Sequence, residues 1–347
     1  MFSRRGRQVG QARRIATIGG AGVGVLGAVA GAVVGLILGE VKVAEHRIPK
    51  ALTDPPNSDG TVWAAAGVSP HRPPIRVAML GDSLAAGYGV ARSRDTPAAQ
   101  LAIGISAAAR RPVRITNVAV VGSESKDLAA QLDRLEARGG RPELAVLMIG
   151  ANDVTERTGP ERVVHLLEEA VRRLRARGAE VVVGTCPDLG TIRPLPQPLR
   201  WYARRLSRTM AKEQTIAVVH AGGRTVSLGD LLGPIFDGRR DLFAADEFHP
   251  SAAGYVEAVA AILPSCLDAL GLRTRTRAAG PFTTRRAKPV EKAAAQAVQR
   301  PGSEVAPADK ILRRGRGGLV RLRRRRQQRR DVTSRETATQ VTPATTG

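Results

Sequence analysis

The sequence contains only two cysteines among its 347 residues. This scarcity excludes a disulfide-dense scaffold and a zinc site built from several thiolates. Cys186 and Cys266 could still form one bridge in an oxidising compartment, and their number leaves that open. Histidines, cysteines and carboxylates also show no cluster with the spacing of metal ligands, so we expect neither a metal nor another cofactor.

Aromatic residues are scarce as well, at 3% of the chain. The net charge of +23 would suit a nucleic-acid-binding protein, but most of it lies at the two ends. Residues 1–14 contain five arginines, and residues 273–347 contain 20 basic and 5 acidic residues. The basic tail lacks the interleaved aromatic side chains on which bases stack, so we expect no nucleic-acid partner.

Near the N-terminus, residues 15–39 form a run without any charged side chain. Its 25 residues exceed the roughly 20 that cross the hydrocarbon core of a bilayer. Residues 1–14 precede it as a basic cytoplasmic N-terminus, because the positive flank of a membrane span stays inside. We expect an uncleaved signal anchor that places the rest of the chain outside the cytoplasm, at the cell envelope. A cleaved secretory signal, which would release the protein, is the alternative.

Two further segments differ in composition from the middle of the chain. Residues 40–73 contain PPNSDG and HRPP without sustained periodicity, and we interpret them as a linker. Residues 273–347 include RLRRRRQQRR, and we predict a basic disordered tail. Such a block could contact an anionic surface such as a membrane. Residues 74–272 remain as one near-neutral globular domain.

Within residues 74–272, short apolar runs rich in β-branched residues alternate with longer segments of helical spacing. The predicted strands are residues 75–80, 113–118, 144–149, 180–185 and 215–219. The predicted helices lie near residues 95–110, 126–138, 159–177, 199–213 and 251–270. This alternation predicts an α/β three-layer sandwich with a parallel sheet that is covered on both faces. Ligands bind such sheets at the carboxyl ends of the strands.

Two candidate catalytic positions follow the first two predicted strands. Ser83 lies in MLGDSLAAGYGV, three residues after the first strand, where a glycine-rich turn could expose a nucleophile. Gly122, in NVAVVGSES, could aim a backbone N–H at a bound oxygen. Each motif taken alone is also typical of an ordinary turn.

Two more candidates lie further along the chain. Asn152, in GAND, directly follows the third strand, and its side-chain amide can donate to an oxyanion. Asp246 and His249, in DEFHPS, are three residues apart before the last helix, so the carboxylate can orient the imidazole. A helix cap is the alternative role of Asn152.

Taken together, the four motifs resemble the SGNH/GDSL family of serine hydrolases, over about residues 74–272. Gly81–Leu84 matches the first block of the family, Gly122 the second, Gly150–Asp153 the third, and Asp246 with His249 the last. The resemblance implies the SGNH hydrolase fold, a five-stranded parallel sheet in the flavodoxin-like order 2-1-3-4-5.

The resemblance also implies a role for each site residue. Ser83 would be the nucleophile, His249 the general base and then the acid, and Asp246 the residue that orients the imidazole. The backbone N–H groups of Ser83 and Gly122 and the amide of Asn152 would form the oxyanion hole.

The expected function is that of a serine ester hydrolase, an esterase or lipase that works through an acyl-enzyme at the cell envelope. Its substrates would be lipid esters or small-acyl esters of the O-acetyl type, and whether water or another alcohol accepts the acyl group stays open. The alternative hypothesis is a catalytically inactive, membrane-tethered adaptor that works through its basic tail. The complete set of four motifs argues against that hypothesis.

Overall fold

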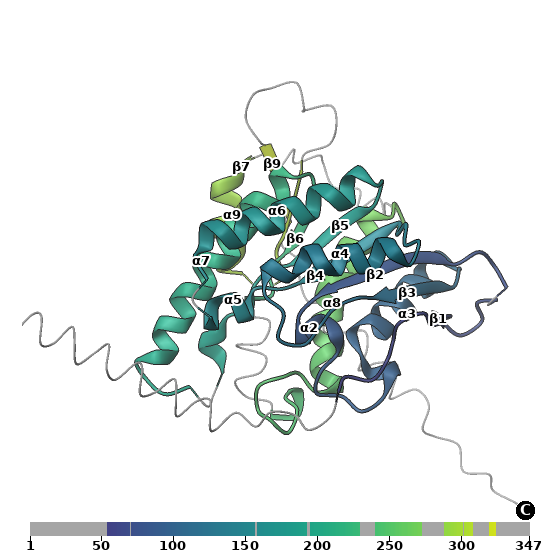
Figure 1. Cartoon of the computed structure of the whole chain (residues 1–347), viewed down its shortest axis with the longest axis horizontal. Helices are drawn as coiled ribbons and strands as arrows, with labels where there is room; N and C mark the ends of the chain where they lie inside the picture. The colour runs from purple at the N-terminus through teal and green to yellow at the C-terminus, as the bar shows by residue number, and fades with distance from the viewer. Residues whose placement is uncertain are drawn as a thin grey trace, which may run out of the picture.

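The computed structural model describes residues 54–69, 71–156, 158–192, 195–229, 240–272, 288–300, 302–307 and 319–323 (Figure 1). The predicted signal anchor, residues 15–39, lies outside the described residues, and so do residues 324–330 of the basic block RLRRRRQQRR.

Five parallel strands form the centre of the sheet. They are β2 (Ile75–Gly81), β3 (Val113–Asn117), β4 (Leu144–Met148), β5 (Glu180–Gly184) and β6 (Arg224–Val226). Their spatial order is β3-β2-β4-β5-β6, and each neighbouring pair is parallel. The predicted flavodoxin-like order is therefore confirmed. All five residues of β4 are buried, as expected for a central strand with both faces covered.

The prediction of a five-stranded, purely parallel sheet was wrong at the edges, because the described sheet is mixed and has nine strands. On one side, β1 (Val62–Trp63) pairs antiparallel with β3. On the other side, β6 is followed by β8 (Glu304–Pro307), β9 (Leu319–Arg323) and β7 (Lys288–Pro289), all in antiparallel pairs. A bare edge strand would leave backbone N–H and C=O groups without partners, and these additions pair them.

The predicted linker is partly folded onto the domain. Backbone N–H of Asn117 donates to the Asp59 carboxylate at 3.0 Å, and the Asn117 amide donates to the Ser58 hydroxyl at 3.2 Å. Val68 is buried, and Trp63 packs against the core. Residues 54–69 are therefore part of the domain and do not form a free linker.

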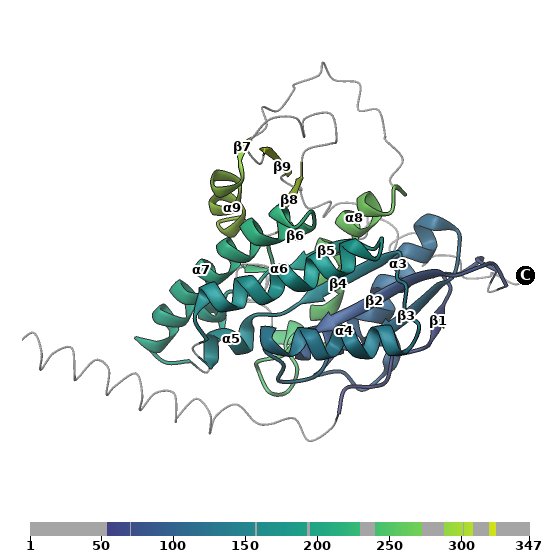
Figure 2. The ribbon, with the colours of Figure 1, turned by 45° about the horizontal axis from the view of Figure 1, so that its top comes forward.

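The predicted disordered tail is also partly folded. Its helix α9 (Val290–Val298) packs against α7 (Leu199–His220), as Figure 2 shows beyond β6. The apolar face of α9 includes Val290, Ala293 and Ala297, all buried in one cluster with Val305 of β8. Apolar spacing of this kind buries one face of a helix, so the prediction of disorder was wrong for this part of the tail.

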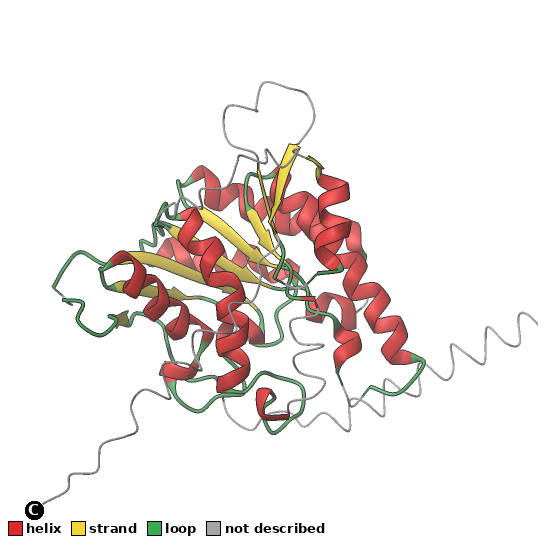
Figure 3. Ribbon diagram, turned by 180° about the vertical axis from the view of Figure 1, so that it is seen from behind, coloured by secondary structure: helices red, strands yellow, loops and turns green. Residues whose placement is uncertain are grey.

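Helices cover both faces of the sheet (Figures 1 and 3). One face carries α3 (Pro97–Ala109) and α8 (Ala252–Ala269), and the other carries α4 (Leu128–Ala137) and α6 (Pro160–Ala176). These helices confirm four of the five predicted ones. Shorter helical turns are α2 (Ser83–Ala86), α5 (Ala151–Thr155), η1 (Ser93–Asp95), η2 (Ser125–Asp127), η3 (Leu189–Thr191) and η5 (Arg240–Leu242).

The fifth predicted strand, residues 215–219, is the C-terminal part of α7 and not a strand. The prediction for 199–213 thus gave a helix that was too short, and the true fifth strand is β6. Thr215, Val218 and Val219 are buried, and Ala211 and Gln214 precede them on the same helical face. A short β-branched run on the buried side of a long helix has the same composition as a buried strand.

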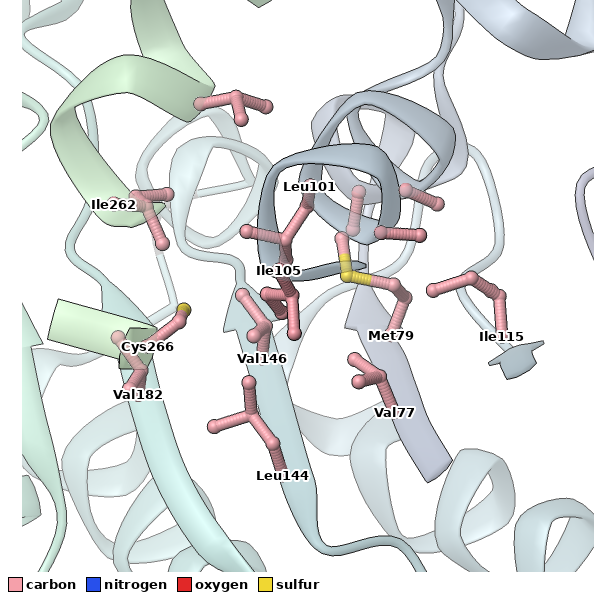
Figure 4. Close-up of a cluster of buried hydrophobic side chains, with 14 of the residues drawn as sticks. Val77, Met79, Leu101, Ile105, Ile115, Leu144, Val146, Val182, Ile262 and Cys266 are labelled. Atoms are coloured by element: carbon pink, nitrogen blue, oxygen red, sulfur yellow. The ribbon is translucent and has the colours of Figure 1, made fainter. Parts of the chain in front are cut away.

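The two cores lie on opposite faces of the sheet. Figure 4 shows the one beneath α3 and α8, in which Met79, Val146 and Ile105 interdigitate and Cys266 lies beside Val182. Cys186 belongs to a different cluster, near α7, and both cysteines are free thiols. Cys186 and Cys266 therefore do not form a disulfide bond in this structure. Burial raises the pKa of the Cys186 thiol, so it stays protonated and is not a second nucleophile.

Among the described residues, α8 is the one helix long and apolar enough to cross a membrane. It packs against α3 and over β5, so its apolar side belongs to the core of the domain.

Candidate active site

The turn that presents Ser83 is held by close backbone packing between β2 and β4. Gly81 has a φ of +132°, and a Cβ at this position would lie 1.9 Å from the Met148 carbonyl oxygen. Only glycine can adopt this backbone conformation and approach so closely. The Gln131 side chain of α4 accepts from Gly81 N–H and donates to Gly81 C=O, both at 2.8 Å. The sequence analysis did not single out Gln131, although a glutamine on the buried face of a helix is a usable signal.

Asp82 fixes the start of α2. Its carboxylate accepts a hydrogen bond from Leu84 N–H at 3.0 Å as the N-cap. Asp82 lines, together with Ser83 and Met148, the pocket described below, and it is only 3% exposed. Burial raises the pKa of the Asp82 carboxyl to about 7, and nearby Asp153 adds to the increase.

Ser83, His249 and Asp246 form a continuous chain of hydrogen bonds. His249 Nε2 lies 3.0 Å from Ser83 Oγ, and His249 Nδ1 lies 2.6 Å from Asp246 Oδ2. Since the carboxylate can only accept, Nδ1 carries the proton and Nε2 is left to accept the serine proton. The structure therefore brings these three predicted site residues together, although Ser83 and His249 are 166 residues apart in the sequence.

Asp246 is itself held by backbone donors. Its Oδ1 accepts from His249 N–H at 2.9 Å and from Phe248 N–H at 3.0 Å. Burial alone would raise the pKa of Asp246. The hydrogen bonds from the His249 ring and from these two backbone groups outweigh it and lower the pKa below its ordinary value. The carboxylate thus stays ionised beside the imidazole.

Aromatic rings flank the imidazole on two sides. The rings of Tyr88 and Phe248 lie 4.5 Å and 4.7 Å from the His249 ring, in edge-to-face orientation. The hydroxyl of the fully buried Tyr255 donates to Tyr88 C=O at 2.7 Å and so ties α8 to the turn after α2. These contacts restrict rotation of the imidazole. Sequence reasoning assigned no role to these three aromatic residues, although Tyr88 lies in MLGDSLAAGYGV and Phe248 directly precedes His249 in DEFHPS.

The predicted oxyanion-hole donors follow three neighbouring strands. Ser83 follows β2, Gly122 lies in the turn after β3 with a φ of +80°, and Asn152 lies on α5 after β4. Val120 N–H donates to Gly81 C=O at 3.1 Å, which holds the Gly122 turn beside the Ser83 turn. One hydrogen of the Asn152 amide bonds Ser123 C=O at 2.9 Å, and an amide nitrogen has a second hydrogen to donate.

Asp153, the last residue of the GAND motif, supports this arrangement from beneath. Its Oδ1 accepts from Ser125 N–H at 3.0 Å, and its Oδ2 accepts from Ser125 Oγ at 2.9 Å. These bonds connect α5 with η2, the segment that follows Gly122. Burial raises the pKa of the Asp153 carboxyl, against the hydrogen bonds from Ser125, which lower it. Its position in the motif was noted in the sequence, but this role was not.

An open pocket of about 580 Å³, including its mouth, adjoins Ser83 and His249. It runs along the carboxyl ends of β4, β5 and β6 and is lined mainly by apolar side chains. These include Met148, Ile149, Leu189, Ile192, Leu228 and Phe248. The residues that the structure describes contain no group of three or more His, Cys, Asp or Glu side chains able to hold a metal ion. The pocket can therefore hold an apolar group against the serine.

A hydrogen-bonded Ser–His–Asp chain at the carboxyl edge of a parallel sheet is the arrangement of a serine hydrolase. Residues 79–256 match the GDSL-like Lipase/Acylhydrolase family, and the chain belongs to that family. It is 41% identical over 241 residues to GDSL-like esterase Rv1075c of Mycobacterium tuberculosis (strain ATCC 25618 / H37Rv). That alignment covers 68% of this chain and 77% of the relative. As the motifs predicted, the protein is a carboxylic ester hydrolase of the GDSL/SGNH type.

Similar solved structures include LAE5, an alpha/beta hydrolase from the metagenome of Lake Arreo, Spain. It is 20% identical, with a TM-score of 0.45, over 61% of this chain and 99% of that one. Axe2, an acetylxylan esterase from Geobacillus stearothermophilus, is 18% identical with a TM-score of 0.44, over 58% of this chain and 97% of that one.

Proposed function

We propose that the protein hydrolyses small-acyl or lipid esters at the cell envelope through an acyl-enzyme on Ser83. The observation that carries this proposal is the pair of contacts made by His249, 3.0 Å to Ser83 Oγ and 2.6 Å to Asp246 Oδ2. It gives the serine a base and gives that base a fixed tautomer.

In the first half of the reaction, Ser83 Oγ attacks the ester carbonyl while His249 Nε2 takes its proton. The negative charge that develops on the carbonyl oxygen is stabilised by the backbone N–H groups of Ser83 and Gly122 and by the Asn152 amide. The imidazolium then gives its proton to the leaving alcohol, and the acyl group stays on Ser83. Asp246 keeps the ring oriented and offsets its transient positive charge.

In the second half, His249 takes a proton from water, and the resulting hydroxide attacks the acyl carbonyl. Collapse of this intermediate returns the proton to Ser83 Oγ and releases the carboxylic acid. Another alcohol could replace water at this step, which would transfer the acyl group instead of hydrolysing the ester.

The substrate class is supported by the lining of the pocket. Leu189 and Ile192 come from the longer connection after β5, and Leu228 follows β6, so this wall of the pocket is mainly apolar, although Asp188 and Thr191 also line it. Such a wall favours an alkyl group over a charged one, because burying a charge without a partner is costly. A pocket that opens to solvent also suits esters presented at a surface.

The location at the envelope rests on the sequence alone. The uncharged run of residues 15–39, with five arginines before it, supports an uncleaved anchor with the domain outside the cytoplasm. Labelling of Ser83 in intact cells by a charged, membrane-impermeant fluorophosphonate would support this topology. Labelling only after lysis would contradict it.

The proposed chemistry is tested with p-nitrophenyl esters of increasing acyl length, applied to the full chain and to Ser83→Ala. We expect turnover and fluorophosphonate labelling in the full chain and nearly none in Ser83→Ala. Ser93→Ala, on η1, is the matched control and should keep both. Labelling that persists in Ser83→Ala would refute the assignment of the nucleophile, and an unchanged rate along the series would refute the acyl pocket.

A further inference from the structure

The first two turns of α7 carry two adjacent aromatic side chains that face solvent. Trp201 is 58% exposed and Tyr202 is 38% exposed. The chain contains only two tryptophans and three tyrosines, and its other tryptophan, Trp63, packs against the core. Indole and phenol rings combine an apolar body with a polar tip, so they suit a boundary between water and an apolar phase.

The part of the chain around these two aromatic residues is strongly basic. From Leu189 to Lys212 the sequence has six basic and no acidic residues. Two of the arginines, Arg204 and Arg208, lie 3.5 Å and 2.9 Å from the fully buried carboxylate of Asp188. Arg205 is exposed, and its guanidinium carbon lies 5.9 Å from the centre of the Trp201 ring. Exposed charge in this segment is therefore positive throughout.

This part of α7 is attached to the wall of the active-site pocket. Ser207 Oγ accepts from Leu189 N–H at 3.2 Å, and Arg204 donates to Gly190 C=O at 3.1 Å. Leu189 and Asp188 both line the pocket beside Ser83. In Figures 1 and 2, α7 extends past α5, the helix that follows the carboxyl end of β4. The aromatic residues thus flank the catalytic edge of the sheet.

We propose that Trp201, Tyr202 and Arg205 form a docking surface for an anionic lipid bilayer, which turns the pocket toward the membrane. This inference rests on the proposed action on esters at the cell envelope, and it concerns a surface separate from the predicted anchor and tail. The guanidinium group would pair with lipid phosphates, and the two rings would lie at the level of the headgroups. The exposed positive charge of Arg205, beside the Trp201 ring, is the complement of such a surface.

Trp201 itself reports on the contact. In a Trp63→Phe variant of the full chain, Trp201 is the remaining tryptophan, and Trp63 Nε1 has no hydrogen-bond partner to lose. The protein is reconstituted into vesicles of phosphatidylcholine, with or without phosphatidylglycerol, whose acyl chains are brominated. We expect the Trp201 emission to shift to shorter wavelength and to be quenched more strongly in the anionic vesicles.

The matched control places the reporter at the opposite edge of the sheet. Val62 is 37% exposed on β1, where it pairs with the start of β3. Val62→Trp, combined with Trp63→Phe and Trp201→Phe, keeps the anchor and the tail but moves the tryptophan away from α7. We expect little quenching there, and we expect Arg205→Glu to reduce the quenching of Trp201.

Quenching of Trp201 that equals the control, or that does not depend on anionic lipid, would overturn the proposal. Unchanged quenching in Arg205→Glu would also overturn it. Turnover of a soluble ester by the same preparations tests the proposed function separately, because it does not require the docking surface. Active protein without Trp201 quenching would therefore refute only the docking surface.

Discussion

Replacing Asp82 with asparagine should make the protein more stable at high pH relative to the unchanged chain. Asp82 is 3% exposed, and burial raises the pKa of its carboxyl from 3.8 to about 7. Asparagine has nearly the same shape, carries no charge and caps a helix as well as aspartate does. Asp82→Asn therefore keeps the bond to Leu84 N–H and removes only the ionisation.

The direction of this pH effect on stability follows from the number of protons bound in the folded and in the unfolded state. Between pH 3.8 and about 7, the folded protein holds a proton that the unfolded chain releases. The stability contributed by this proton is complete below the unfolded pKa and is lost as the pH rises through the folded pKa. The two pKa values differ by about three pH units, and each corresponds to about 1.4 kcal/mol, so the whole effect is about 4 kcal/mol.

The free energy of unfolding is measured in urea at pH 5 and pH 8, for the unchanged chain and for Asp82→Asn. We expect the variant to gain about 3 kcal/mol relative to the unchanged chain between these two pH values. Asp133→Asn, at an exposed carboxylate on α4, is the control and should show a much smaller change. If the free energies of unfolding of Asp82→Asn and of the unchanged chain differ by the same amount at pH 5 and pH 8, the argument from burial is refuted.

Three further predictions follow from the site and the sheet edge. Asn152→Ala should lower kcat on a soluble ester by roughly 10²–10³ if its amide stabilises the oxyanion, and a loss below about tenfold would leave it only the structural role of its bond to Ser123 C=O. Gly81→Ala should greatly lower the melting temperature and the activity, because its Cβ would lie 1.9 Å from Met148 C=O; an unchanged melting temperature would contradict this. Removing residues 288–347 should lower the free energy of unfolding, by about 1.5 kcal/mol or more for each buried valine that becomes exposed. Removing only residues 324–347 should keep ester turnover and weaken binding to anionic vesicles. Equal melting temperatures for the two truncations, or equal vesicle binding by the shorter truncation and the full chain, would contradict these expectations.

The centre of the fold could be predicted because local patterns and burial agree there. Strands such as Leu144–Met148 are continuous apolar runs between amphipathic helices, and only a parallel sheet covered on both faces buries them all. The edges could not be predicted in the same way. Val62–Trp63 and Glu304–Pro307 are too short to show a period, and they are strands only because β3 and β6 offer them backbone partners.

The site was predictable for a related reason. Ser83, Asn152 and His249 lie in short motifs next to strand or helix ends, and the carboxyl ends of parallel strands meet at one edge. Residues that reach the site from distant helices lie outside these motifs, and the sequence does not show which segment they will contact. Gln131 reaches the Ser83 turn from α4, and Tyr255 reaches the Tyr88 carbonyl from α8.

The sequence by itself determined the class of the protein, because the motif residues, their order and the strands that precede them are local properties of the chain. Only the tertiary structure decided how far the domain extends and how the site is held. Burial and hydrogen bonds between distant segments turned part of a predicted tail into α9 and β8, and they placed aromatic rings around His249. Such interactions depend on which segments become neighbours, and that is settled only when the whole chain packs.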